Sequence, residues 1–344
     1  MALPLHPPFP PMEAQSVDAI PVGEEWQYEP KWDGFRGIIF RDGDKIEIQS
    51  KSGQPLTRYF PELVDAFRSL KPKQFVLDGE LVVPEGRAFS FDALLQRIHP
   101  AQSRVQRLAA ETPALFVAFD LLVDARAKLL TGYLLPERRG ALEAFADKHL
   151  RGGKSIRLSP ATTRLSVAKG WLTRVGTTLD GIIAKRRDVP YLSGERTGVQ
   201  KIKNYRSADC VVGGFRYNEG KPHVGSLLLG LYDEAGLLNH VGFTSAIPAA
   251  ERPALTARLE ALVEPPGFTG AAPGGTSRWS TDRSSEWQPL RPELVAEVRF
   301  DHVTSRRFRH GTGFLRWRPD KAPEQCRMEQ LAPAAPLSML ENMG

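Results

Sequence analysis

The stretch that decides the fold is YEPKWDGFRGIIF, residues 28–40. It places a lysine, an aspartate and an arginine around one glycine, where an apolar run begins. β-Branched and aromatic residues on both sides of the Asp33-Gly34 pair predict a strand, a turn and a second strand. Lys31 would then end the first strand and lie next to the turn.

Lys31 is the candidate nucleophile of this stretch. Most lysines are charged surface groups, and a lysine amine attacks only when burial or nearby cations lower its pKa. The apolar Trp32 and Phe35 predict such a dry setting, and Gly34 lets the backbone turn tightly. The pattern K-x-D-G-x-R is short, however, and needs support from the rest of the chain.

The composition is that of a soluble globular protein, with 41% hydrophobic and 25% charged residues. A length of 344 residues favours two domains, and a net charge of +6 is compatible with a polyanionic partner without requiring one. No apolar run is long enough to span a bilayer, and the Pro-rich start does not resemble a signal peptide, so we expect a cytoplasmic location. Cys210 and Cys326 are too few and too far apart to predict a zinc site or a disulfide framework.

The pattern of apolar residues changes after Tyr205. Up to that point, predicted strands and amphipathic helices follow one another, and FVLDGELVVPEG, residues 75–86, predicts a strand pair that turns at Asp78-Gly79. Residues 206–335 contain short strands and one helix, which predicts a small β-barrel. We therefore expect domains at 1–205 and 206–335, followed by a flexible tail at 336–344.

Five further polar clusters occur at predicted strand ends or turns, where a rigid sheet can support a site. In order, they are SKSG (50–53), DGE (78–80), FD (119–120), DGIIAK (180–185) and KIK (201–203). Each alone has a plain structural interpretation. DGE is compatible with a simple turn, Phe119 with the core, and the two lysines of KIK with a solvated strand edge.

In this order the clusters resemble the covalent nucleotidyltransferases, which comprise ATP-dependent DNA ligases, RNA ligases and mRNA capping enzymes. The resemblance extends from Glu29 to about Cys326. It is greatest to the short bacterial ATP-dependent DNA ligases of the C type, which have two core domains. It implies an α+β, ATP-grasp-like adenylation domain of antiparallel sheets flanked by helices, followed by a small oligonucleotide-binding (OB) barrel.

The resemblance implies a reaction in three steps. Lys31 attacks the α-phosphorus of ATP, AMP passes to the 5′-phosphate at a DNA nick, and the adjacent 3′-hydroxyl displaces AMP. Glu29 would contact the adenine edge and Phe119 would stack on the base, while Glu80 and Asp180 would hold Mg²⁺ or Mn²⁺. The implied nucleotide-binding residues are Glu29, Arg36, Lys51, Glu80, Phe119, Lys201, Lys203, Arg316, Arg318 and Lys321.

The last three of these residues belong to RWRPDK, residues 316–321, which matches the motif that orients the pyrophosphate in ligases. Some positions depart from the family pattern. Asp180 stands where a glutamate is usual, Lys51 where many relatives have arginine, and Val199 where many have tryptophan. GGKS, residues 152–155, lacks the first glycine of a phosphate-binding loop and is interpreted as an ordinary loop.

Nicked double-stranded DNA is the implied partner, together with a repair polymerase or another repair protein. We expect a monomer that binds no membrane and contacts the DNA backbone with little sequence preference. Short-patch base repair and double-strand-break joining both remain open as pathways. Two alternatives also remain: an RNA ligase or capping-type enzyme, and a non-catalytic OB-fold protein that binds nucleic acid.

Overall fold

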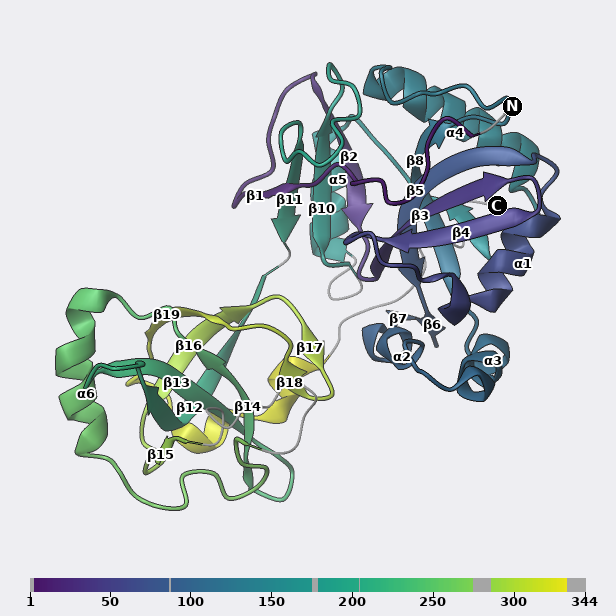
Figure 1. Cartoon of the computed structure of the whole chain (residues 1–344). Coiled ribbons are helices and arrows are strands. Elements are labelled where there is room, and N and C mark those ends of the chain that lie inside the picture. Colours follow the sequence, from purple (N-terminus) through teal and green to yellow (C-terminus); the bar gives the residue numbers. More distant parts are fainter. Residues whose placement is uncertain (1–2, 87, 175–178, 204, 275–285, 333–344) are drawn as a thin grey trace. The chain divides into compact units, whose positions relative to one another are not determined.

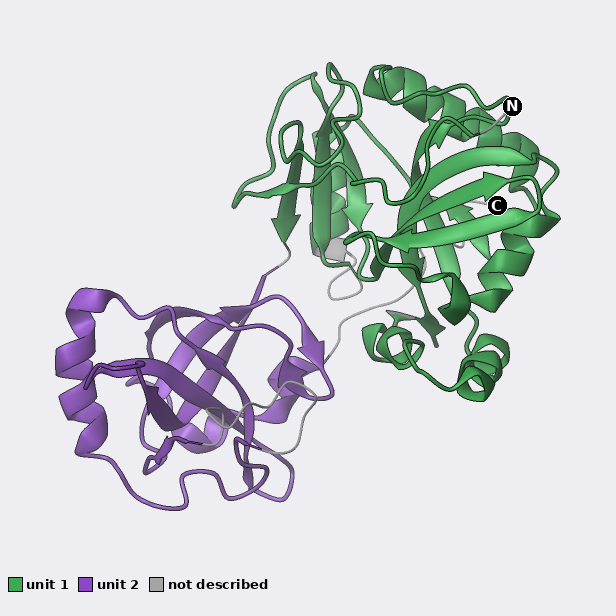
Figure 2. Cartoon of the chain, viewed as in Figure 1, with its two compact units in different colours: residues 1–204, 333–344 green, residues 205–332 purple. Residues whose placement is uncertain are grey.

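The computed structural model describes residues 3–86, 88–174, 179–203, 205–274 and 286–332 (Figure 1). Contacts divide the chain into two compact units, residues 1–204 and residues 205–332 (Figure 2). The expected tail at 336–344 lies outside the described residues. Among those residues, no helix is long and apolar enough to cross a membrane.

The larger sheet of the first unit has five strands in the order β4-β3-β5-β8-β9. All neighbours are antiparallel except β8 and β9. The stretch that begins at Tyr28 supplies the two strands expected for it, because three residues, with a bend at Gly34, separate β2 (Trp26–Lys31) from β3. The two strands belong to different sheets. The bounds are β3 (Phe35–Asp42), β4 (Lys45–Ser50), β5 (Gln74–Val82), β8 (Leu115–Val123) and β9 (Ile156–Leu158).

The second sheet of this unit has four strands in the order β1-β11-β10-β2. Strand β10 pairs antiparallel with both β2 and β11, and the short β1 pairs parallel with β11. The bounds are β1 (Gln15–Ser16), β2 (Trp26–Lys31), β10 (Gly181–Arg186) and β11 (Val199–Lys203). A two-stranded ribbon, β6 (Pro84–Glu85) and β7 (Ala88–Phe89), follows β5.

Helices cover the outer faces of the two sheets (Figure 1). Helices α1 (Pro61–Ser69) and α4 (Leu135–His149) pack with alternate residues of the five-stranded sheet, and α5 (Leu165–Arg174) packs on β2 and β10. Two further helices complete the unit, α2 (Phe91–Gln96) and α3 (Gln102–Glu111). Because side chains alternate along a strand, the residues between these apolar positions point to the opposite, inner faces.

The expectation of a turn at Asp78-Gly79 is wrong. Strand β5 continues through both residues and pairs with β3 on one side and β8 on the other. The pairing with β8 shifts register between them, and a Cβ on Gly79 would lie 2.3 Å from the ring of Phe116. A small residue is therefore needed inside the sheet, and the Asp-Gly pair serves close packing rather than a turn.

The N-terminal segment, residues 3–16, is an ordered strap along the inner side of the first unit. Leu3 and Met12 are buried in a cluster with Ile38 and Phe40 of β3. The amide of Phe9 donates to Gln49 of β4, and its carbonyl accepts from the same side chain. The strap thus connects the five-stranded sheet with β11, which pairs with β1.

The second unit is built on a sheet with the strand path β14-β13-β12-β16-β19, with β15 pairing to β12. An isolated bridge joins Thr244 with Thr312, but strand pairing does not close this path into a barrel in the described part of the chain. The bounds are β12 (Arg206–Tyr217), β13 (Val224–Tyr232), β14 (Leu238–Thr244), β15 (Gln288–Pro289), β16 (Val295–Phe300) and β19 (Gly313–Trp317). A hairpin of β17 (Val303–Thr304) and β18 (Arg307–Phe308) and helix α6 (Arg252–Glu260) complete the unit.

Candidate active site

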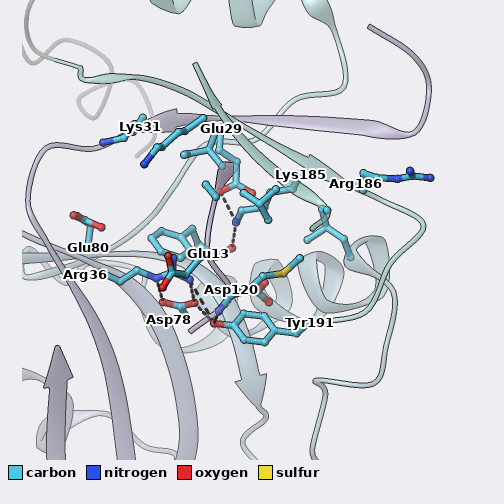
Figure 3. Close-up of a pocket in the computed structure, with 18 of the residues that line it drawn as sticks. Glu13, Glu29, Lys31, Arg36, Asp78, Glu80, Asp120, Lys185, Arg186 and Tyr191 are labelled. Carbon is cyan, nitrogen blue, oxygen red and sulfur yellow. Dashed lines mark hydrogen bonds and ion pairs between the residues drawn. The ribbon is translucent and has the colours of Figure 1, made fainter. Parts of the chain in front are cut away.

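A cavity of about 230 Å³ lies in the first unit, lined by side chains of both sheets and the strap (Figure 3). We call it the central cavity. Part of its polar lining comes from residues that alternate with the apolar core positions of β2, β3, β5, β10 and β11, and the rest comes from the strap, β8, helix α4 and loops. It includes Glu13, Glu29, Lys31, Arg36, Lys51, Asp78, Glu80, Asp120, Arg138, Lys185, Tyr191 and Lys201.

Lys31 ends β2 and forms an ion pair with Asp180, which directly precedes the adjacent strand β10. Burial lowers the pKa of Lys31 to about 8, and the cations Lys201 and Lys203 act in the same direction. Glu80 and the neighbouring Asp33 oppose this shift. The side chain is 22% exposed and lines the cavity, and the lowered pKa leaves its amine partly deprotonated near neutral pH.

The turn that follows Lys31 fits tightly against β5. A Cβ on Gly34 would lie 2.1 Å from the carbonyl oxygen of Leu81, a distance that no side chain tolerates. The same strand carries Glu80, which pairs across the sheet with Arg36. Gly34 therefore lets the lysine-bearing turn approach the strand that supplies a carboxyl group.

Glu80 has the raised pKa of a buried carboxyl group. Burial raises its pKa to about 7, while Lys31 and Arg36 lower it and Asp33 and Asp78 raise it further. A proton can therefore be exchanged at this position near neutral pH, unlike at an ordinary exposed glutamate.

Arg36 is held in a buried network with Asp78 and Tyr191. Its Nε and Nη2 atoms donate to the two carboxylate oxygens of Asp78 at 2.9 and 2.6 Å. The Tyr191 hydroxyl donates to Asp78 at 2.6 Å and accepts from the amide of Met12 at 3.0 Å. Figure 3 shows the three side chains converging at the base of the cavity. The pairing fixes the arginine before any ligand binds.

Phe119 of β8 lines the cavity, and two cations lie over its ring. The distances to the ring centroid are 5.2 Å from the guanidinium carbon of Arg36 and 4.6 Å from the amine of Lys185. The same Lys185 amine pairs with Glu29 of β2 at 2.8 Å, and Gln27 donates to the other oxygen of that carboxylate at 2.9 Å. Glu29 is therefore an oriented carboxylate, with one partner on each oxygen, beside an aromatic ring.

Asp120 and Arg138 form a buried ion pair that supports the cavity wall. The side chains are 4% and 2% exposed, and two hydrogen bonds of 3.0 and 3.1 Å join them. The Arg138 guanidinium also donates to the carbonyl of Tyr133 and lies 5.6 Å from the ring of Tyr191. The pair links helix α4 to the network of Tyr191.

Lys201 of β11 also faces the cavity, and burial and the neighbouring Lys203 lower its pKa. Lys203 is outside the cavity lining but close enough to affect the pKa of Lys31. Lys51, after β4, pairs with Glu13 of the strap at 3.0 Å. The central cavity thus carries several cations within one concave surface.

The three residues of the C-terminal motif lie in the second unit, on and after β19. Arg318 and Lys321 donate to the two oxygens of Asp209 at 2.9 and 2.6 Å. Arg316 donates to Glu297 of the paired strand β16 at 2.7 Å. Within their own unit, all three cations are held by carboxylates.

Divalent cations prefer carboxylate oxygens and commonly use one or two protein carboxylates together with substrate phosphates. Asp180 and Glu80 both act on Lys31, the first through an ion pair and the second by raising its pKa. Their oxygen donors fit such a cation. Within the described ranges, no group of three or more His, Cys, Asp or Glu side chains could hold a metal ion.

Sequence patterns anticipated most of the cavity's charged residues but not their connections. The structure brings Glu29, Lys31, Arg36, Lys51, Glu80, Phe119 and Lys201 to one cavity, with Asp180 paired to Lys31. Sequence reasoning missed Glu13, Tyr191 and Arg138, which lie in the strap, a loop and a helix. No local pattern marks these residues, because their neighbours in the cavity are far away in the chain.

Two protein-family models match the chain. The model described as the ATP dependent DNA ligase domain matches residues 11–203, and that of the ATP dependent DNA ligase C terminal region matches residues 220–321. The chain is 46% identical over 348 residues to DNA ligase C2 of Mycolicibacterium smegmatis, covering 96% of each chain.

A more distant relative is the multifunctional non-homologous end joining DNA repair protein LigD of Mycobacterium tuberculosis. It is 30% identical over 307 residues, which are 88% of this chain and 37% of that protein. Among solved structures, a Lig E DNA ligase has a TM-score of 0.56 at 17% identity, covering 89% of this chain and 99% of that one. At that identity, the similarity concerns the fold.

Proposed function

Since the chain belongs to the family of ATP-dependent DNA ligases, we propose that Lys31 is the residue that carries AMP during its reaction. The observation that carries the proposal is the partly buried side chain of Lys31, whose pKa is lowered to about 8, in a cavity lined with cations and carboxylates. The neutral amine is the nucleophile, and AMP then passes to the 5′-phosphate of a nick before the 3′-hydroxyl seals it.

In the first step the Nζ atom of Lys31 forms a bond to the α-phosphorus of ATP. The bond between that phosphorus and the bridging oxygen breaks, pyrophosphate leaves, and the nitrogen loses a proton. Asp180 already pairs with the same nitrogen, and the lysine side chain lines the cavity. Positioning and charge neutralisation supply most of the catalysis in phosphoryl transfer, and both are features of this cavity.

The adenine is proposed to bind between Phe119 and Glu29. The aromatic ring offers a stacking surface, and the Glu29 carboxylate can accept a hydrogen bond from the exocyclic amine of adenine. Guanine would present a carbonyl oxygen to that carboxylate instead, which is repulsive. Lys185 and Gln27 hold the carboxylate in place, so the arrangement favours ATP over GTP.

The phosphates of ATP are proposed to contact Lys201, Lys203 and Lys51, and Arg36 is proposed to lie at the ribose and the neighbouring phosphate. Lysine and arginine side chains form strong charge-assisted hydrogen bonds with phosphate oxygens. Asp180 and Glu80 would hold Mg²⁺ or Mn²⁺, which when bound would neutralise negative charge on the phosphates. The departure at Asp180 keeps the carboxylate and shortens its side chain by one methylene group.

The second unit is proposed to be an OB-type module that acts on the leaving group and on DNA. The isolated bridge between Thr244 of β14 and Thr312 next to β19 brings the two ends of the sheet path together and supports that assignment. Arg316, Arg318 and Lys321 would orient the pyrophosphate during the first step. We propose that the enzyme repairs nicked duplex DNA on the bacterial chromosome, in the cytoplasm, as a monomer alongside a repair polymerase or other repair protein.

The proposal is tested by locating the nucleotide on the protein. The chain is incubated with α-labelled ATP and Mg²⁺, digested, and analysed by mass spectrometry, and the adduct is then chased with nicked duplex DNA. We expect AMP on Lys31 and its loss when the nick is added. Lys45→Ala, which changes an exposed lysine of the β3–β4 hairpin, is the matched control and should retain the adduct. AMP on another residue would refute the assignment.

A further inference from the structure

The strap places one carboxylate at the central cavity with a fixed backbone. The amide of Glu13 donates to the carbonyl of Glu195 at 2.7 Å, and the preceding amide of Met12 donates to Tyr191. Three residues further on, Ser16 pairs with Lys201 of β11. Anchors on both sides thus determine where the Glu13 side chain lies, and it lines the cavity.

Two cations contact this carboxylate, and a third interacts with it electrostatically. One oxygen of Glu13 accepts from Lys51 Nζ at 3.0 Å and from Arg196 Nε at 3.2 Å. Lys51 and Arg196 lower the pKa of Lys201, and Glu13 raises it, so the four groups interact as one cluster. We call Glu13, Lys51, Arg196 and Lys201 the strap cluster. With three cations and one carboxylate, the cluster has a net positive charge.

The cluster has the chemistry of a phosphate site. Lysine and arginine donors that bind a carboxylate oxygen bind a phosphate oxygen in the same way, and the phosphate carries more charge. The contact is also accessible, because the side chains of Glu13, Lys51 and Arg196 are 25%, 55% and 72% exposed. An incoming anion can therefore exchange with the carboxylate without unfolding the strap.

The ion pairs of Glu13 are more exposed to solvent than those of the other paired carboxylates of the cavity. Glu29 and Asp78 are buried, and their partners Lys185 and Arg36 are largely enclosed as well. Those pairs are fixed parts of the wall. The pairs of Glu13 lie at the solvent side, where exchange is cheap because exposed ion pairs contribute little free energy.

We propose that Glu13 occupies a phosphate subsite formed by Lys51, Arg196 and Lys201, and that a phosphate group of the substrate displaces it. The inference rests on the proposed function, because it requires a phosphorylated substrate in the central cavity. The phosphate belongs either to ATP or to the DNA strand at the nick. In both cases Glu13 competes with the substrate and lowers its apparent affinity.

The test uses Glu13→Gln in the full chain, which keeps the size of the side chain and removes its charge. Glu111→Gln is the matched control, since it removes a carboxylate that pairs with Arg107 on helix α3, outside the cavity lining. One arm measures the KM for ATP in formation of the protein-AMP adduct. The other arm measures the KM for a nicked duplex that already carries the 5′-adenylate.

We expect Glu13→Gln to lower the KM in one arm by about two- to fivefold at low salt, the range expected for exposed ion pairs. The arm that responds identifies the source of the phosphate. The gain should shrink as salt screens the cluster, and Lys51→Ala in the same chain should abolish it. A KM that rises, or stays unchanged in both arms, would overturn the proposal.

A second substitution keeps the test valid if the glutamine variant folds poorly. Glu13→Ser shortens the side chain and must change the KM in the same direction. The outcome is also separable from that of the proposed function. If the wild-type chain forms the adduct on Lys31 and seals nicks while both Glu13 variants behave like the wild type, only the present inference fails.

Discussion

Lys31 in the central cavity and Arg318 in the C-terminal motif are both cations, but their surroundings shift their pKa values in opposite directions. In the cavity, burial lowers the pKa of Lys31 to about 8. In the second unit, the hydrogen bonds that Arg318 donates to Asp320, together with the charge of Asp209, raise the pKa of Arg318. A group that must attack has to release its proton, whereas a group that must attract an anion has to keep its charge.

The largest expected effect concerns Lys31, the proposed nucleophile of the central cavity. Lys31→Ala should abolish the protein-AMP adduct and reduce nick sealing by roughly a thousandfold or more, because the proposed covalent intermediate forms on this amine. Sealing of a nick that already carries the 5′-adenylate should survive, since that step does not need the lysine. Gel-based sealing assays with the two substrates measure both effects. Equal loss on both substrates would contradict the assigned role.

The second prediction concerns stability, because the cavity relies on buried pairs and the C-terminal motif does not. Asp120→Asn leaves the Arg138 guanidinium enclosed without its counter-charge, which costs about 3–5 kcal/mol of unfolding free energy. Chemical denaturation measures this loss. Asp147→Asn on the same helix, in an exposed pair with Arg151 just beyond the end of the helix, should cost less than about 1 kcal/mol. Similar losses in both variants would show that burial does not distinguish the pairs.

The third prediction uses pH to separate the two regions. Only the neutral amine of Lys31 attacks, so the rate of adduct formation should rise about tenfold per pH unit below about 8 and level off above it. Sealing of the pre-adenylated nick should lack this dependence. Single-turnover rates between pH 6 and 9 provide the measurement. A flat profile for adduct formation would mean that the amine is not the group that limits the rate.

The smallest effect concerns the anchor of the C-terminal motif. Asp209→Asn weakens the hydrogen bonds that hold Arg318 and Lys321, each worth about 1.5 kcal/mol when charged groups are involved. We expect adduct formation to slow by about tenfold, while sealing of the pre-adenylated nick changes little. Arg318 and Lys321 are 19% and 23% exposed, so the protein should remain folded. Loss of both reactions together would instead indicate a general defect of the second unit.

Local patterns predicted the strands and the charged residues that they carry. The bend at Asp33-Gly34 and the strands on both sides of it are present. The sequence predicted them because β-branched and aromatic residues flank the Asp-Gly pair. The expectation for Asp78-Gly79 was wrong because the same residue pair has a different role inside a sheet. Only the neighbours on both sides of β5, which belong to distant segments, distinguish the two cases.

The supporting residues of the cavity could not be predicted for the same reason. Tyr191 is 113 residues from Asp78 and 179 from Met12 in the chain, yet its hydroxyl joins them. Glu13 has no motif around it, and its role follows from the path of the strap past β11. Residues that act directly within a motif are visible in the sequence, whereas those that depend on packing of distant segments are not.

Gly34 has a practical consequence for the redesign of this enzyme. Libraries that aim at other nucleotide triphosphates would naturally randomise the conspicuous K-x-D-G-x-R stretch. The carbonyl of Leu81 leaves no room for even one methyl group at the glycine, so every clone altered there carries a misplaced lysine before its new specificity can be assayed. Such a library should instead vary the residues proposed to surround the adenine and keep Gly34 constant.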